Sequence, residues 1–314
     1  MGRYLVTGVA GFVGSAVASA LIKGGHDVVG MDNLSNGFEK NIPPEVRFLK
    51  GDCQDARLYA ELPEGGYDAI YHLAGQSSGE VSFDDPVYDL RTNTESTLHL
   101  LHFARARGCR RFIYASSMSV YGQQPNEPVQ EDAPTCPLSF YGVGKLASEH
   151  YLRIYEQFGI SSTALRLFNI YGPGQNMDNL RQGMVSIFMA MMVNDGHIHV
   201  RGTPNRFRDF VYIDDVVAAC LACLERPQSG GRALNVGGSG KVQVGELIEK
   251  LCALSETPVT VEYTGCTAGD MFGIQADLSR AAKYLGYEPE VGIDEGLKRM
   301  YDWCLRTRAA AGGR

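Results

Sequence analysis

Hydrophobic positions in the first half of the chain follow two alternating patterns. Short runs rich in β-branched and aromatic residues, typical of buried strands, begin near residues 3, 27, 46, 68 and 110. Segments with apolar positions three or four residues apart, typical of helices, begin near residues 14 and 86. This alternation predicts βαβ units in an α/β fold, with a doubly wound parallel sheet and helices on both faces.

The second half begins with a helical pattern over 141–158 and one buried strand over 163–172, and then becomes irregular. A strand and a helix follow over 208–225, with Asp214 or Asp215 as the expected helix cap, and another strand runs over 233–238. We therefore expect a larger α/β domain over 1–172, to which 208–238 returns. A smaller α/β C-terminal substrate lobe is expected over 173–207 and 239–314.

Composition and charge limit the class of protein. The 314 residues are 44% hydrophobic and 21% charged, as in ordinary folded proteins. A net charge of −7 provides no broad cationic surface, which argues against nucleic acid or an anionic membrane as the main partner. Because the chain has no stretch of eighteen apolar residues and no leader-like start, we expect a cytoplasmic protein.

The eight cysteines are scattered along the chain, which favours reduced thiols over a disulfide framework. Cys220 and Cys223 have a Cys-x-x-Cys spacing but lie in an apolar helical run without a second pair or a nearby histidine. We expect both in the core, and no metal site.

The strand ending at Thr7 runs directly into a turn with glycines at positions 8, 11 and 14, followed by a helix. Such a turn lets the backbone approach a pyrophosphate at the helix N-terminus. Asp32 ends the next strand about 20 residues on, where a carboxylate binds the adenosine ribose hydroxyls and repels a 2′-phosphate. The pattern predicts a Rossmann sheet that binds NAD in preference to NADP.

The chain resembles the extended short-chain dehydrogenase/reductases, which include nucleotide-sugar epimerases and dehydratases. The resemblance covers nearly the whole length. It rests on the glycine turn, DNLSNG, GD at 51–52, HLAG at 72–75, Asn93, SSMSVYG at 116–122, Tyr141 with Lys145, LRLFNIYGPGQ and RDFVYIDDV.

The resemblance implies a set of NAD-binding residues. Asp52 and Cys53 are expected beside the adenine, Leu73, Ala74, Gly75 and Gln76 along the cofactor, and Asn93 near its phosphates. The predicted cofactor site comprises Gly8, Gly11, Phe12, Val13, Gly14, Asp32, Asn33, Asp52, Cys53, Leu73, Ala74, Gly75, Gln76, Asn93, Ala115, Tyr141, Lys145 and Phe168.

Tyr141 and Lys145 are four residues apart on a predicted helix, so both side chains lie on one face. The lysine ammonium and the positive nicotinamide are expected to lower the pKa of the tyrosine towards neutrality, which makes it a usable base. Lys145 is also expected to hold the nicotinamide ribose. Ser117 stands where the family has the Ser or Thr that hydrogen-bonds the reacting sugar oxygen.

Two neighbouring positions discriminate between reactions. The family's 4,6-dehydratases usually have Asp-Glu where this chain has Met118 and Ser119, and its decarboxylases commonly keep the Glu. Neither Met118 nor Ser119 can exchange a proton at neutral pH as a carboxylate does. The sequence therefore favours oxidation and re-reduction of one carbinol, and no elimination.

The resemblance also implies contacts to the nucleotide sugar. Asn169 is expected at the sugar-linked phosphate and Arg208 at the diphosphate. Where the family usually has the Arg of an RPGD-like motif, this chain has Thr267, in Thr267-Ala268-Gly269-Asp270, so Arg181, Arg201 or Arg206 would replace its charge. The predicted substrate site comprises Ser78, Ser117, Met118, Asn169, Arg181, Arg206, Arg208 and Asp270.

Together these residues predict an NAD-dependent nucleotide-sugar 4-epimerase, with UDP-glucose and UDP-galactose as the default pair. UDP-N-acetylhexosamines, UDP-uronic acids and dTDP- or GDP-sugars stay open, as do a dehydratase, a net dehydrogenase and a noncatalytic dinucleotide sensor. Ile274 aligns with a large tyrosine of strict UDP-glucose epimerases, which suggests room for an N-acetyl group. The resemblance further implies a homodimer, formed by the helix of Tyr141 and Lys145 and the long helix before it.

Overall fold

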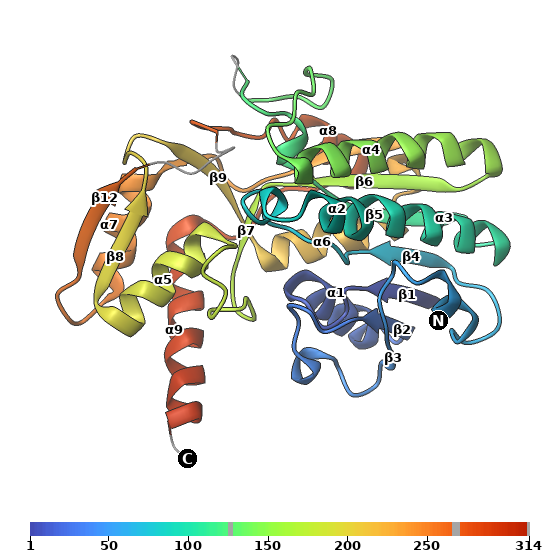
Figure 1. Cartoon of the computed structure of the whole chain (residues 1–314), viewed down its shortest axis with the longest axis horizontal. Coiled ribbons are helices and arrows are strands. Elements are labelled where there is room, and N and C mark those ends of the chain that lie inside the picture. Colours follow the sequence, from blue (N-terminus) through green and yellow to red (C-terminus); the bar gives the residue numbers. More distant parts are fainter. Residues whose placement is uncertain (125–127, 266–270, 313–314) are drawn as a thin grey trace.

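A seven-stranded parallel sheet forms the larger part of the molecule (Figure 1). The structure is a computed structural model and describes residues 1–124, 128–265 and 271–312. The strand order is β10-β6-β5-β4-β1-β2-β3, so the direction of winding reverses between β1 and β4. The strands are β1 (Arg3–Thr7), β2 (Asp27–Asp32), β3 (Arg47–Lys50), β4 (Ala69–His72), β5 (Arg111–Ser117), β6 (Ser161–Leu167) and β10 (Arg232–Val236). The predicted doubly wound sheet is confirmed.

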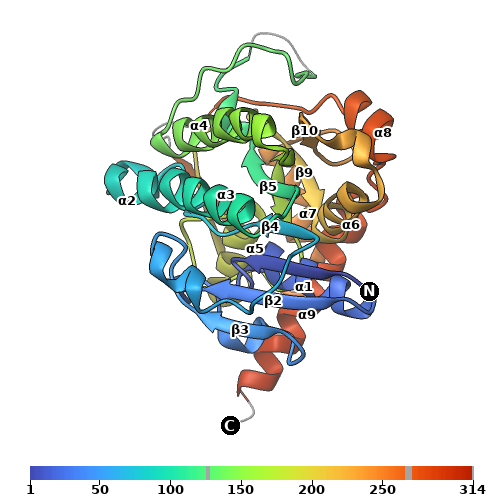
Figure 2. The same cartoon turned by 90° about the vertical axis from the view of Figure 1, so that its right-hand side faces the viewer.

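Helices cover both faces of this sheet, because successive strand residues point to opposite sides (Figure 2). Tyr4 and Val6 pack with the helices of one face, and Leu5 between them packs with those of the other. The first face carries α1 (Phe12–Lys23), α6 (Ile213–Glu225) and α8 (Ser279–Leu285). The second face carries α3 (Ser96–Ala106) and α4 (Phe140–Tyr155).

The helix predicted near 86–108 has an irregular middle. It begins as α2 (Pro86–Leu90), passes through a π-helical turn over Arg91–Glu95 and continues as α3. Asp85 caps the start, because its carboxylate accepts a hydrogen bond from Tyr88 N at 2.9 Å. The π-helical turn contains the buried residues Asn93 and Thr94, and such turns are frequent near functional sites.

The smaller part of the molecule has its own apolar core, at one side of the large sheet (Figure 1). It contains a three-stranded sheet in the order β11-β9-β7 and a parallel pair of β12 and β8. Its strands are β7 (Asn169–Tyr171), β8 (His197–Arg201), β9 (Phe207–Tyr212), β11 (Lys241–Gln243) and β12 (Thr260–Thr264). Its helices are α5 (Met184–Asp195), α7 (Val244–Leu254) and α9 (Ile293–Gly312).

The structure corrects two expected elements. The strand expected over 163–172 is two strands in different sheets: β6 ends at Leu167, and β7 pairs with β9. The helix expected to be capped by Asp214 or Asp215 begins earlier, at Ile213, without a side-chain cap. The Asp215 carboxylate instead accepts hydrogen bonds from the backbone N–H groups of Glu290 and Val291 at 2.9 and 3.3 Å.

The chain crosses between the two parts several times. After β9, helix α6 packs on α1, and β10 joins the edge of the large sheet beside β6. The predicted domain boundaries stay a prediction.

The described part of the chain contains no helix that is both long enough and apolar enough to span a membrane. Over the same residues, no group of three or more His, Cys, Asp and Glu side chains is arranged to hold a metal ion. Cys220 and Cys223 are fully buried between α6 and the sheet.

Candidate active site

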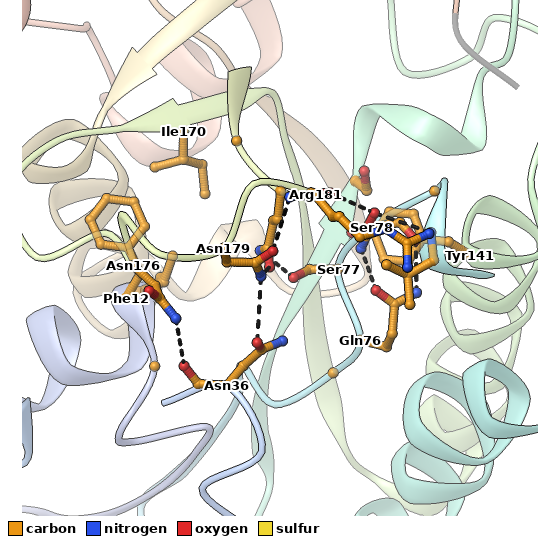
Figure 3. Close-up of a pocket in the computed structure, with 18 of the residues that line it drawn as sticks. Phe12, Asn36, Gln76, Ser77, Ser78, Tyr141, Ile170, Asn176, Asn179 and Arg181 are labelled. Carbon is orange, nitrogen blue, oxygen red and sulfur yellow. Dashed lines mark hydrogen bonds between the residues drawn. The ribbon is translucent and has the colours of Figure 1, made fainter. Parts of the chain in front are cut away.

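A cavity of about 930 Å³ lies at the carboxyl ends of the central strands and extends towards the smaller part of the molecule (Figure 3). It is lined by the glycine turn after β1, the loops after β2, β3, β4 and β5, the start of α4, and the segment between β7 and α5. Ligands of open α/β sheets bind where the winding reverses, which here is between β1 and β4.

The glycine turn brings the backbone of β1 against that of the next loop. Gly8 has φ +72°, and a methyl group there would lie 2.7 Å from Ala74 N, so only glycine fits without strain. A methyl group at Gly14 would lie 1.9 Å from Gly8 O, which explains how α1 packs tightly on the turn. These contacts leave the N-terminus of α1 open to the cavity, as a pyrophosphate site requires.

Asp32 is fixed at the end of β2 by backbone donors. Its carboxylate accepts hydrogen bonds from Ala10 N at 2.9 Å and Leu34 N at 2.7 Å. Leu34 has φ +60°, an uncommon conformation for a non-glycine residue. Beside it, Asn33 Nδ2 donates to Asp52 Oδ2 at 2.7 Å. Asp32 and Asp52 both line the end of the cavity where an adenosine is expected.

Nearly all predicted cofactor residues line this one cavity. They are Gly8, Gly11, Phe12, Val13, Gly14, Asp32, Asn33, Asp52, Cys53, Leu73, Ala74, Gly75, Gln76, Ala115, Tyr141, Lys145 and Phe168.

Asn93 is the exception among them, because its side chain is buried behind the cavity wall. Asn93 Nδ2 donates to Gln76 O at 2.9 Å and to Asp89 Oδ1 at 3.1 Å. Asn93 thus supports the loop after β4, and its expected place near the cofactor phosphates stays a prediction.

Tyr141 lies in the first turn of α4, which Ser139 caps by accepting a hydrogen bond from Gly142 N at 3.1 Å. Lys145 follows one turn later. Its Nζ donates to Ala115 O at 2.8 Å and lies 5.7 Å from the centre of the Tyr141 ring. Ser117, the last residue of β5, lines the same wall. The structure brings the three predicted catalytic side chains together.

Burial has the largest effect on the pKa values of Tyr141 and Lys145. It raises the pKa of Tyr141 to about 12, although the Ser117 hydroxyl lowers it, and it reduces the pKa of Lys145 to about 8. The expected lowering of the tyrosine pKa by Lys145 is absent in the protein by itself. The reason is the burial of the phenol, while the Lys145 ammonium is directed to Ala115 O. The positive charge of a bound nicotinamide is then the group still expected to stabilise the phenolate of Tyr141.

Met118 and Ser119 also line the cavity, next to Ser117. Ser117 Oγ donates to Ser119 Oγ at 3.1 Å, and Asn169 Nδ2 lies 3.5 Å from the Met118 sulfur. The positions that carry carboxylates in dehydratases therefore face the site here without an acid.

Four arginines line the cavity at its substrate end: Arg181, Arg201, Arg206 and Arg208. Arg208 is buried, and its guanidinium donates to the carbonyls of Phe207, Met271 and Phe272 at 2.6, 2.8 and 3.2 Å.

The other arginines are more exposed. Arg181 forms ion pairs with Asp84 at 2.7 Å and Glu80 at 3.8 Å, and Arg201 pairs with Glu80 at 3.3 Å. These ion pairs offset the charges of Arg181 and Arg201, and Arg181, Arg201 and Arg206 all stay candidates for the missing diphosphate cation.

Asp270 lies outside the described residues. Ile274 is fully buried against Val120, Tyr121 and Phe168 and does not line the cavity, so it provides no argument for a roomier sugar pocket.

Sequence reasoning missed a set of polar contacts across the cavity (Figure 3). The segment between β7 and α5 donates from Asn176 Nδ2 to Asn36 O and from Asn179 Nδ2 to Asn36 Oδ1, both at 3.4 Å. Gln182 in the same segment bonds Ser77 Oγ. The only signal in the sequence is the polar, loop-like composition of 175–182.

Comparison with known proteins identifies the class. The family model described as "NAD dependent epimerase/dehydratase family" matches residues 4–237, and the chain belongs to this family. The UDP-glucose 4-epimerase of Mycolicibacterium smegmatis is 35% identical over 308 residues, which cover 96% of this chain and 98% of that protein.

Two solved structures share the fold. The UDP-glucose 4-epimerase of Thermotoga maritima, solved with UDP-glucose, superposes with a TM-score of 0.91 at 32% identity and covers 98% of this chain and 99% of its own. The UDP-glucuronic acid 4-epimerase of Bacillus cereus, solved with UDP-glucuronic acid and NAD, gives 0.88 at 30% identity, with 97% and 99% coverage. The predictions of an extended short-chain dehydrogenase/reductase, an epimerase and NAD as cofactor are confirmed.

Proposed function

We propose that this enzyme interconverts UDP-glucose and UDP-galactose by inverting the configuration at C4 of the sugar. The observation that carries this proposal is the wall formed by Ser117, Tyr141 and Lys145, which faces the same cavity as the glycine turn. The absence of carboxylates at Met118 and Ser119 supports epimerisation over elimination.

The part of the cavity beside the large sheet has the features of an NAD site. Gly8 and Gly14 form a backbone cradle that any Cβ would fill, at the N-terminus of α1. Asp32 presents a carboxylate, already oriented by two backbone donors, to the ribose hydroxyls. When bound, NAD supplies the chemistry that accepts a hydride from C4 and returns it.

The protein residues move and hold protons. Tyr141 takes the proton of the 4-hydroxyl as the C4 hydrogen leaves as hydride, which gives a 4-keto sugar. After the sugar turns over, Tyr141 returns the proton as hydride is delivered to the other face, so the net redox change is zero. Ser117 hydrogen-bonds the reacting oxygen, and Lys145 holds Tyr141 and the nicotinamide ribose in place.

A panel of nucleotide sugars tests this proposal. Purified protein, with no cofactor added, is mixed with UDP-glucose, UDP-N-acetylglucosamine, UDP-glucuronic acid and dTDP- and GDP-hexoses, and products are followed by NMR. We expect UDP-galactose from UDP-glucose and no 4-keto-6-deoxy sugar from any substrate. A dehydrated product, or turnover of UDP-glucuronic acid alone, would replace the proposed activity with one of its alternatives.

We also propose a homodimer. Several large apolar side chains are exposed on α2, on α4 and just after α4, which lie side by side (Figure 2). They include Val87, Leu90, Phe140, Val143, Ile154 and Phe158. A second copy of these helices would cover them in a four-helix bundle.

Light scattering at micromolar concentration tests the dimer. We expect a dimer that Val87→Asp weakens, whereas Leu305→Asp, on the exposed side of α9, has no effect. A wild-type monomer would overturn the idea.

The cytoplasmic location also stays a prediction, and cell fractionation would test it.

A further inference from the structure

Asp89, a residue of α2 without a role in the mechanism so far, is a buried carboxylate close to the cavity. Its side chain is 1% exposed. Oδ1 accepts hydrogen bonds from Gln76 Nε2 at 2.8 Å and from Asn93 Nδ2 at 3.1 Å. Oδ2 is buried and has no hydrogen-bond partner among the described residues. Such a group is costly to bury, so its presence calls for a reason.

The unpartnered oxygen faces the helix that carries the acid/base pair. Helix α4 passes close to α2 because Gly144 has no side chain: a methyl group there would lie 3.5 Å from Asp89 Oδ2 and 3.1 Å from Thr94 Oγ1. Gly144 lies between Tyr141 and Lys145. The Asp89 carboxylate therefore lies close to the backbone between the two side chains, and its charge raises the pKa of both.

Asp89 favours the charged form of Lys145. Burial lowers the pKa of Lys145 to about 8, and Asp89 opposes that effect. Lys145 forms no ion pair with any carboxylate in the described part of the chain, and its Nζ contacts Ala115 O and the face of the Tyr114 ring.

The hydrogen-bonded oxygen fixes a second part of the site (Figure 3). Gln76, which Asp89 holds by its Nε2, also donates from Nε2 to Ser78 O at 2.8 Å and accepts from Ser78 N at 2.5 Å. Ser78 Oγ then donates to Arg181 O at 2.9 Å. Asp89 thus anchors the loop after β4 and, through it, the segment that closes the substrate end of the cavity.

We propose that Asp89 is a positioning residue for the Tyr141–Lys145 pair, which it serves by keeping Lys145 charged and by fixing the turn at Gln76. It lies behind the cavity wall and does not line the cavity. This inference rests on the proposed function, since it assigns a role relative to the acid/base pair named there.

The other titratable groups nearby do not share this role. His72 on β4 is neutral, because burial lowers its pKa to about 3. Glu149 on α4 is paired with Arg166 at 2.7 Å. The remaining charged side chains on α2, the π-helical turn and the preceding loop are exposed; they are Asp84, Asp85, Arg91 and Glu95.

Two variants separate the two effects. Asp89→Asn removes the charge and keeps an acceptor for Gln76 and Asn93. Loss of a negative charge lowers the pKa of both Tyr141 and Lys145, so both limbs of the kcat/KM profile should move to lower pH, by about half a unit or more. Asp89→Leu also removes the acceptor, and KM for the nucleotide sugar should rise about threefold or more.

The test uses the full chain with its bound cofactor. The pH–rate profiles are measured beside an NMR titration of lysine labelled with ¹³C at Cε, in which the signal of Lys145 is assigned by its loss in Lys145→Arg. The matched control is Glu95→Gln, which removes an exposed carboxylate from the adjacent turn. We expect the Lys145 midpoint to fall in both Asp89 variants and to stay unchanged in the control.

An unchanged Lys145 midpoint in a folded Asp89 variant would overturn the inference, and either variant suffices if the other does not fold. An unchanged KM in Asp89→Leu would overturn the anchoring role. If the wild type epimerises no nucleotide sugar, the proposed function fails, whereas the NMR titration still decides whether Asp89 controls Lys145.

Discussion

The ammonium of Lys145 lies 5.7 Å from the centre of the Tyr141 ring, with both side chains buried in one wall of the cavity. Because burial raises the pKa of Tyr141 to about 12, the phenol of the protein by itself is a poor base. We therefore expect the activation of Tyr141 to depend on positive charge that arrives with the cofactor.

Replacement of the tyrosine tests this assignment. We expect Tyr141→Phe to lower turnover by at least about a hundredfold, the scale of a lost general acid/base. Binding of NAD and nucleotide sugar should persist, since the ring stays in place. Tyr155→Phe, at the end of the same helix, is the control and should keep its turnover. Near wild-type turnover in Tyr141→Phe would remove the residue from the mechanism.

Asp32 should decide the choice of cofactor. Two backbone donors hold its carboxylate in place, so it cannot turn away from a 2′-phosphate. We expect apoprotein to regain activity with NAD and to bind NADP about ten to a hundred times more weakly. Asp32→Asn should narrow that gap by removing the repulsion. Equal reconstitution of the wild type by both cofactors would contradict the prediction.

The sequence predicts best what depends on local spacing. The glycine turn, Asp32 at the end of β2 and the Tyr141–Lys145 pair each need only one element and its neighbour, and all of them line the cavity. Strand periodicity likewise indicates the parallel sheet. Such features can be predicted because backbone geometry within a few residues determines them.

Contacts between elements far apart in the sequence cannot be predicted from local spacing. Asn93 has the residue type of a ligand-binding side chain, yet it does not line the cavity, and its Nδ2 donates to Gln76 O. In the sequence, Asp89 is one polar residue of an amphipathic helix. Its burial is evident only in the structure, where α4 passes close to it at Gly144. Whether a polar side chain faces water or a neighbouring helix depends on tertiary packing.

The arginines should differ in their contribution to nucleotide binding. Arg208 is buried with its guanidinium held by three carbonyls, and a phosphate that loses a charge-assisted partner costs about 1.5–3 kcal/mol. We expect Arg208→Ala to weaken UDP binding by roughly tenfold to a hundredfold, and Arg206→Ala to show a smaller loss.

Calorimetric titration with UDP measures these effects. Arg181→Ala is the comparison, because the ion pairs with Asp84 and Glu80 already offset that charge, and it should change affinity least. Thermal unfolding of each variant separates lost binding from lost structure, and Arg208→Lys should recover part of the affinity. Unchanged affinity in a folded Arg208→Ala would show that the diphosphate is held elsewhere.

His72 should make the stability of the protein depend on pH. It is fully buried between Thr7 and Thr97, whose hydroxyls lie 2.8 and 3.1 Å from its ring nitrogens. Burial lowers its pKa from 6.5 to about 3, so the folded state holds it neutral where the unfolded chain already binds a proton. The stability it contributes is fully present above about pH 6.5 and is lost as the pH falls towards 3.

Urea unfolding between pH 7.5 and 4.5 measures this loss. Below pH 6.5 the free energy of unfolding should fall by up to about 1.4 kcal/mol for each pH unit on account of His72. In His72→Gln, which cannot titrate, the slope against pH should be smaller by that amount, even if the variant is less stable at pH 7.5. His102→Gln, an exposed histidine on α3, is the control and should keep the wild-type slope. An unchanged slope in His72→Gln would mean that His72 binds its proton within the folded protein.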